Sequence, residues 1–150
     1  MSGQEQWRLE AIGVTDCVEW HVATSFAEHG VNPGYAVIEG ARRILHFAPR
    51  YLMAINHQGA TPALAATAEA TAVDVTGKWC GYRLHGSRAG DVLAAGTHAD
   101  LMLIGRACAA LSLFDCPVVL LRTEETNEVW VHASYAESLC RALNKMEKTF

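Results

Sequence analysis

Two ionisable side chains are the leading candidates for acid–base chemistry. His57 ends a short apolar run and precedes a Gln-Gly-Ala-Thr-Pro turn, where an imidazole can face a groove and act as general acid or base. Glu39 lies in a long run of periodic apolar residues, and burial against a sheet would raise its pKa toward that of a general base. Structural roles stay open: Glu39 paired with Arg42 or Arg43, and His57 bonded to the backbone.

Asn32 is a third candidate, because it directly precedes Pro33 and the run that carries Glu39. Its simplest role is to cap a helix whose first residue is proline. Its amide would also be able to hold a carbonyl or a water beside Glu39, while the N–H groups of the helix start face a developing oxyanion. We expect no metal site, since the histidines lack the spacing of metal ligands. The five cysteines form no CxxC pair, which favours buried thiols over disulfides.

A long amphipathic helix is expected to position Glu39. Residues 35–48 carry apolar side chains three and four residues apart, and Pro49 would end the helix. Gly40 in the middle costs about 1 kcal/mol relative to alanine, and close packing against a sheet would explain it.

Strands are expected on both sides of His57. The alternating or apolar runs lie at 20–26, 51–57, 64–75, 79–85 and 92–104. Their short glycine-containing connections, such as a hairpin at Gly77 and Lys78, favour antiparallel neighbours. Beyond them we predict a helix over 106–113, strands over 117–122 and 128–132, and a helix over 135–148. The predicted fold class is therefore α+β.

Length and charge limit the remaining choices. A chain of 150 residues, 51% hydrophobic and 19% charged, predicts a single globular domain over residues 1–150. A net charge of −4 with scattered basic residues argues against nucleic-acid binding. No apolar run is long enough to span a membrane and the N-terminus is unlike a signal peptide, so we expect no membrane partner and a cytoplasmic location.

The predicted elements resemble the hotdog fold, and within it the thioesterases related to fluoroacetyl-CoA thioesterase. The segment Asn56–Pro62 is similar to that family's His-x-x-x-Thr-Pro turn. Similar in the same way are Thr67–Ala70 with Val75–Lys78, Gly96–His98 with Leu101–Ile104, and Val31–Pro33 with Val37–Ala41. The resemblance covers about residues 20–105, a core in which a long helix is wrapped by an antiparallel sheet. Residues 106–150 would be a C-terminal strand and helix extension without a counterpart.

The resemblance implies a small acyl-CoA or acyl-carrier thioesterase. Glu39 would activate water or form a transient anhydride, and His57 would polarise the thioester or protonate the leaving thiolate. Asn32 stands where the family has threonine, and the lid associated with fluoroacetyl specificity is missing. Substrate-binding positions would be Pro33, Gly34, Gly59 and Thr61. CoA would enter as part of the substrate without another cofactor, and sheet edges would pair in a homodimer or homotetramer.

Other functions stay open. The same groove would be able to bind a small hydrophobic or acyl ligand without cleaving it, or to support a lyase or dehydratase with His57 as base. A different α+β fold, such as a ligand-sensing domain, is a further alternative. The hotdog prediction fails if the strands at 117–122 and 128–132 join the central sheet and interrupt its order.

Overall fold

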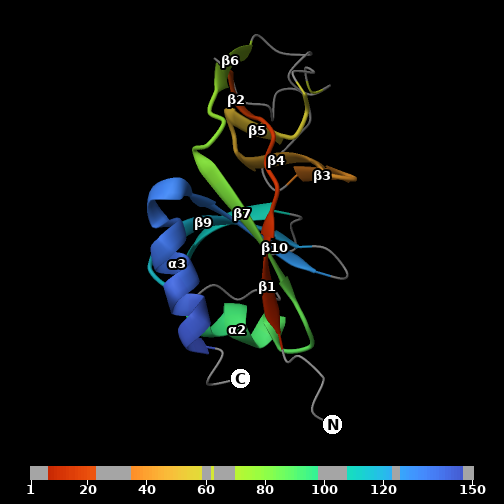
Figure 1. Ribbon diagram of the computed structural model, residues 1–150. Coiled ribbons are helices and arrows are strands. Elements are labelled where there is room, and N and C mark those ends of the chain that lie inside the picture. Colours follow the sequence, from red (N-terminus) through yellow and green to blue (C-terminus); the bar gives the residue numbers. More distant parts are fainter. Residues whose placement is uncertain are drawn as a thin grey trace. The chain divides into compact units, whose positions relative to one another are not determined.

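The computed structural model describes residues 7–22, 35–58, 62, 70–97, 108–122 and 126–146. The chain divides into two compact units: unit 1 comprises 1–12, 80–105 and 110–150, and unit 2 comprises 13–79 and 106–109. The described residues are mostly β, with two five-stranded sheets, α2 and α3 (Figure 1). The single domain expected from the length stays a prediction.

The described elements have the following bounds. The strands are β1 (Arg8–Ile12), β2 (Cys17–Val22), β3 (Tyr35–Glu39), β4 (Arg42–Ala48), β5 (Tyr51–Ile55), β6 (Ala70–Asp74), β7 (Trp79–His85), β8 (Cys108–Leu113), β9 (Cys116–Arg122) and β10 (Asn127–His132). The helices are α2 (Ala89–Gly96) and α3 (Ala133–Met146). The first sheet has the order β1-β7-β10-β9-β8, and the second has the order β3-β4-β5-β2-β6.

The predicted helix over 35–48 is wrong: this segment forms the β3–β4 hairpin. Glu39 pairs with Arg42 across the turn, and Gly40 has a φ of +59°, which glycine adopts without strain. Residues 43–46 of β4 are all buried, so both faces of the strand are covered. A strand that is buried on both faces has no polar face, so its two-residue alternation of apolar and polar side chains is lost. The remaining apolar residues then happened to lie three and four positions apart, as in a helix.

Two further elements were assigned to the wrong class. The predicted strand over 92–104 begins inside α2, whose buried residues Ala89, Val92 and Leu93 have helical spacing. The predicted helix over 106–113 is β8, where partly buried and exposed residues alternate from 109 to 112. The strands predicted at 51–57, 79–85, 117–122 and 128–132 and the helix at 135–148 are confirmed as β5, β7, β9, β10 and α3.

The hotdog prediction is wrong. The described residues contain no long central helix with a sheet around it, and α2 and α3 have 8 and 14 residues. β9 and β10 lie in one sheet with β7 and β1, and β10 separates β7 from β9. The C-terminal strands therefore form part of a main sheet instead of an extension to a core at 20–105.

The core of unit 1 is built around a fully buried tryptophan and a glycine. Trp130 on β10 is 0% exposed, and its ring lies directly against Gly81 on β7. A β-carbon at Gly81 would lie 2.8 Å or less from three ring atoms of Trp130. The glycine therefore creates the space that the indole fills, because close-packed interiors leave no spare volume.

Candidate functional site

The most concentrated polar cluster of unit 2 surrounds Glu19 on β2. One carboxylate oxygen accepts hydrogen bonds from the Tyr51 hydroxyl at 2.7 Å, Lys78 Nζ at 2.8 Å and the Trp79 indole N–H at 3.3 Å. The other lies 3.5 Å from His21 Nε2. β2 brings Glu19 beside β5, which carries Tyr51, while the turn after β6 supplies Lys78.

The surroundings of Glu19 keep its carboxyl ionised. The side chain is only 7% exposed, and burial alone would raise its pKa. The hydrogen bonds from Lys78, Tyr51 and Trp79 outweigh burial and lower the pKa from 4.5 to about 2. Burial and the Glu19 charge in turn raise the pKa of Tyr51. A carboxylate with so low a pKa is a poor general base at neutral pH. The cluster instead has a structural role, because its hydrogen bonds link β2 to Tyr51 of β5 and to Lys78.

Sequence reasoning missed this cluster. It began the first strand at Trp20, whereas β2 starts at Cys17. The earlier start places Cys17, Glu19 and His21 on one face of the strand, because alternate side chains point to the same side. A lone glutamate between apolar residues of a strand was the available signal, but its lysine partner is 59 residues away.

Asn56 links three segments of unit 2. It is 7% exposed, and its side-chain oxygen accepts from the backbone N–H and the hydroxyl of Thr15 at 2.7 and 3.0 Å. Its amide nitrogen donates to the carbonyls of Gly13 and Ala41, both at 3.0 Å. The hydrogen bonds hold the end of β5 against the turn of the β3–β4 hairpin, which makes Asn56 a structural residue.

Replacing Asn56 with glycine is expected to lower the free energy of unfolding by about 1.5 kcal/mol. The loss is limited because water can reach Gly13, Thr15 and Ala41, which are exposed. Asn56→Ala should lose about 1 kcal/mol more, since Asn56 has a φ of +60° that alanine adopts poorly. Urea unfolding of both variants measures the difference. Equal stability of the two would contradict the backbone part of this prediction.

The structure places Glu39 and His57 near the same end of the second sheet. Glu39 is exposed at the end of β3, and His57 follows β5 with its Nε2 buried and without a hydrogen-bond partner in the described part of the chain. Burial lowers the pKa of His57, the charge of Arg42 lowers it further, and Asp16 and Glu39 act in the opposite sense. The charge of Glu39 therefore acts on the pKa of His57. Glu39 itself lies on a strand, and its side chain is exposed to solvent.

The other predicted site residues lie outside the described residues: Asn32, Pro33, Gly34, Gly59 and Thr61. A role for them, or for Glu39 and His57, stays a prediction. Glu39 was expected on a helix that faces the sheet, but it is the last residue of β3 in the β3–β4 hairpin.

The pKa of His57 should respond in opposite directions to two surface substitutions. Arg42→Gln removes a positive charge and should raise it, whereas Glu39→Gln removes a negative charge and should lower it. Both residues are exposed, so neither change should unfold the chain. An NMR titration of the imidazole measures the shift, with Asp91→Asn in unit 1 as the control. Shifts of the same sign in the two variants would contradict the prediction.

Unit 1 has its own buried carboxylate, Glu128 on β10. It is 1% exposed and accepts from the Trp130 indole at 3.3 Å and from Arg83 Nη2 at 3.4 Å. Arg83 also donates to Glu10 at 2.8 Å, and His85 lies 3.4 Å from the same oxygen. Hydrogen bonds from His85 and then Arg83 lower the pKa of Glu10. The network links β1, β7 and β10, the first three strands of the sheet.

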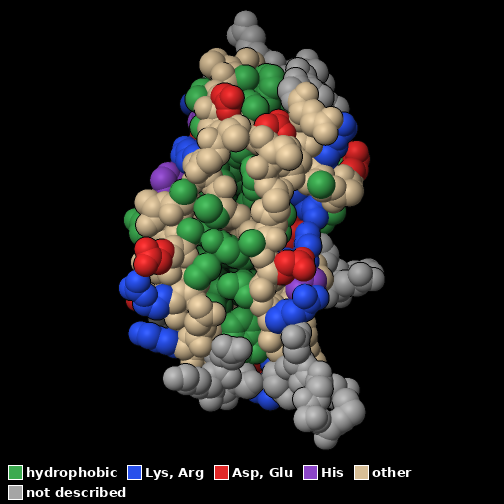
Figure 2. Space-filling model, in the orientation of Figure 1, with side chains coloured by type: hydrophobic (Ala, Val, Ile, Leu, Met, Phe, Trp, Pro, Cys, Tyr) green, Lys and Arg blue, Asp and Glu red, His purple; other side chains and the backbone are tan. Residues whose placement is uncertain are grey.

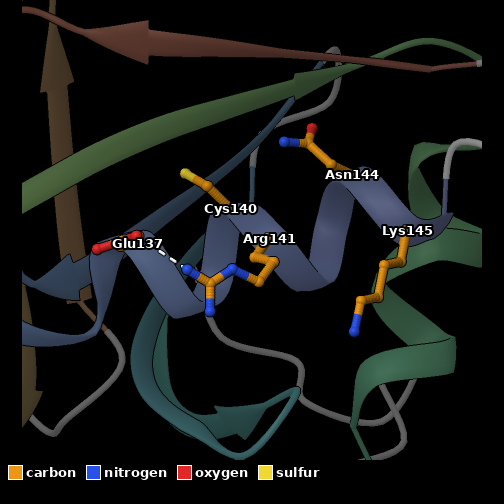
Figure 3. A pocket seen from close by; sticks show the side chains of 5 residues that line it. All are labelled: Glu137, Cys140, Arg141, Asn144 and Lys145. Atoms are coloured by element: carbon orange, nitrogen blue, oxygen red, sulfur yellow. Dashed lines mark hydrogen bonds and ion pairs between the residues drawn. The ribbon is translucent and has the colours of Figure 1, made fainter.

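A cavity of about 550 Å³ lies beside α3 in unit 1. The lining residues are Glu137, Cys140, Arg141, Asn144 and Lys145, which form one face of the helix (Figure 3). Cys140 hydrogen-bonds the Tyr82 side chain on β7, and together with burial this contact raises the pKa of Tyr82 to about 12. None of the five cysteines, Cys140 included, forms a disulfide.

A second cavity, of about 620 Å³, lies between the end of α2 and the β8–β9 turn. Gly96 of α2 packs against the Phe114 ring there, and the Phe114 N–H donates to the Gly96 carbonyl at 2.7 Å. These contacts hold the β8–β9 turn against the end of α2. The described residues that line this cavity are largely small, and Asp115 is the one ionisable residue among them.

Neither a metal-binding cluster nor a membrane-spanning helix is found among the described residues. They contain no grouping of three or more His, Cys, Asp or Glu side chains placed to hold a metal ion. No helix among them is long and apolar enough to cross a membrane.

No family model and no curated protein matches the sequence. The fold, however, is similar to one chain of the heterotetrameric sarcosine oxidase from Corynebacterium sp. U-96, solved in complex with pyrrole 2-carboxylate. The TM-score is 0.77 over 99% of this chain and 87% of the other, at 22% sequence identity. The similarity shows a shared fold. It overturns both the resemblance to hotdog thioesterases and the acyl-thioester hydrolysis and acyl-ligand binding inferred from it.

Proposed function

We propose that this chain is a subunit of a hetero-oligomeric oxidoreductase and acts by binding the other chains of that complex. The observation that carries the proposal is the fold, which matches a chain of a heterotetrameric enzyme along almost its whole length. Because the match extends over 99% of this chain and 87% of the other, it favours a role like that of the matched subunit.

The polar chemistry of the two units supports a structural role. The buried carboxylates Glu19 and Glu128 are each held by charged and neutral donors and join neighbouring strands. Such groups stabilise and specify a fold when their hydrogen bonds are complete. The cavity beside α3 lies on the surface of unit 1 and is bordered by charged side chains, which can pair with charges on a partner protein.

Purification of the full chain from its own host, followed by reconstitution, tests this proposal. The chains that co-purify in fixed stoichiometry are identified and then co-expressed with or without this chain. We expect one assembled species that oxidises sarcosine or a related secondary amine when the chain is present, and incomplete assembly when it is absent. Recovery of the chain alone, or only with copies of itself, would contradict the proposal.

A further inference from the structure

We propose that the cavity beside α3 binds an amphipathic helix of another subunit, one whose apolar stripe is flanked by carboxylates. This inference rests on the proposed function, because it identifies the surface through which the chain joins its complex. It is carried by three features of unit 1: a half-covered apolar floor, a cavity beside it along α3 and a basic rim.

The apolar floor results from the position of α3 on the sheet. α3 packs against β9 and β10 and buries Leu139 and Leu143 completely. β7 and β1 lie beyond β10, with β1 at the edge. Leu9 and Tyr82 on these two strands are therefore only partly buried. Both face the same side as α3, because Tyr82 bonds Cys140 and Leu9 pairs with Leu84.

The cavity lies along α3 and adjoins this floor at Cys140, which lines the cavity and hydrogen-bonds Tyr82. Cys140 and Asn144 point from α3 toward β7 and β1, whereas Arg141 and Lys145 point away from these strands (Figure 3). Figure 2 shows hydrophobic side chains as a band over this region of α3 and β1, with charged side chains along its sides. A volume of about 550 Å³ is enough for several apolar side chains of a docking helix.

The rim decides the charge of the partner. Arg141 and Lys145 lie one turn apart at the C-terminal end of α3. Arg141 pairs with Glu137 at 2.9 Å, but the two side chains are 65% and 85% exposed, so this pair is weak and its arginine can change partner. Carboxylates on the incoming helix complement these cations. A strand added to the edge of β1 would leave the cavity and its basic rim unused, which favours a helix.

Zero-length carbodiimide cross-linking of the purified complex tests the contact directly, because this reagent joins an amine to a touching carboxylate. We expect Lys145 to be linked to Asp or Glu in a helical segment of another subunit. Lys78 serves as the internal control, since it contacts Glu19 within this chain. Links from Lys145 only to this chain, or only to a second copy of it, would overturn the inference.

Two variants test the contact by affinity. Arg141→Glu combined with Lys145→Glu reverses the rim, and Asn144→Trp fills the cavity; each should weaken binding to the identified partner subunits at least tenfold. All three residues are exposed, so the fold should be retained. Tyr135→Ala, which removes a 42% exposed side chain of α3 outside the cavity, should change binding less than twofold.

The outcomes separate the inference from the proposed function. A wild-type chain that binds no other subunit defeats the proposed function itself. A wild-type chain that binds, with both cavity variants binding equally well, defeats the helix-docking inference and leaves the proposed function standing. The salt dependence adds a third measure: the rim variant should lose much of the salt sensitivity of binding, whereas Asn144→Trp should keep it.

Discussion

Glu19→Ala is expected to lower the free energy of unfolding by about 3 kcal/mol, measured by urea denaturation at neutral pH. The substitution removes the single acceptor shared by Tyr51, Lys78 and Trp79, so their donors lose a charged partner. Lys78 is partly exposed and regains water, which keeps the loss at the low end for a broken buried ion pair.

The same carboxylate predicts how stability depends on pH. Because the pKa of Glu19 is lowered from 4.5 to about 2 in the folded chain, its contribution is complete above pH 4.5 and is lost as pH falls toward 2. Glu19→Gln keeps an acceptor oxygen and should lose less stability, but it should also remove this acid dependence. Glu137→Ala is the matched control, since that carboxylate is 85% exposed. A wild-type acid profile in Glu19→Gln would contradict the assignment.

Gly81→Val should also cost about 3 kcal/mol, because it places an isopropyl group where the Trp130 ring lies. Neither the fully buried indole nor the strand it faces can move without opening the core of unit 1. Gly81→Ala should lose about 2 kcal/mol by the same mechanism. Calorimetric melting curves measure both effects.

The control for Gly81 is a glycine in open space. No heavy atom lies within 4 Å of the β-carbon that Gly90→Ala would add, and Gly90 is in α2, where alanine is the better helix former. This variant should be as stable as the wild type or slightly more stable. A Gly81→Val chain that melts like Gly90→Ala would show that the indole has room to move.

Local patterns predicted the second half of the chain better than the first. β7, β9 and β10 carry the alternating or apolar β-branched runs typical of strands, and α3 has a clear polar face; all four elements were predicted. The β3–β4 hairpin was mistaken for a helix because burial on both faces of β4 hides the period of two. The true turn signal was Gly40, which adopts a positive φ in the turn of the β3–β4 hairpin.

The candidate site was predicted less well than the elements, and for a related reason. Once residues 35–48 were assigned to a helix, Glu39 and His57 became the natural acid–base pair, and a family resemblance followed from that error. The clusters found in the structure join residues far apart in sequence, such as Glu19 with Lys78 and Glu10 with Arg83. Only strand pairing brings these together, and no local pattern encodes strand order.

The mass of the complex that contains this chain at its natural level in the host tests the central claim most directly. Native mass spectrometry after gentle purification measures it. We expect one species whose mass equals that of this chain plus different chains in a fixed ratio. A species with the mass of one copy, or of a whole number of identical copies, would contradict the claim that this chain functions as a subunit of a hetero-oligomeric oxidoreductase.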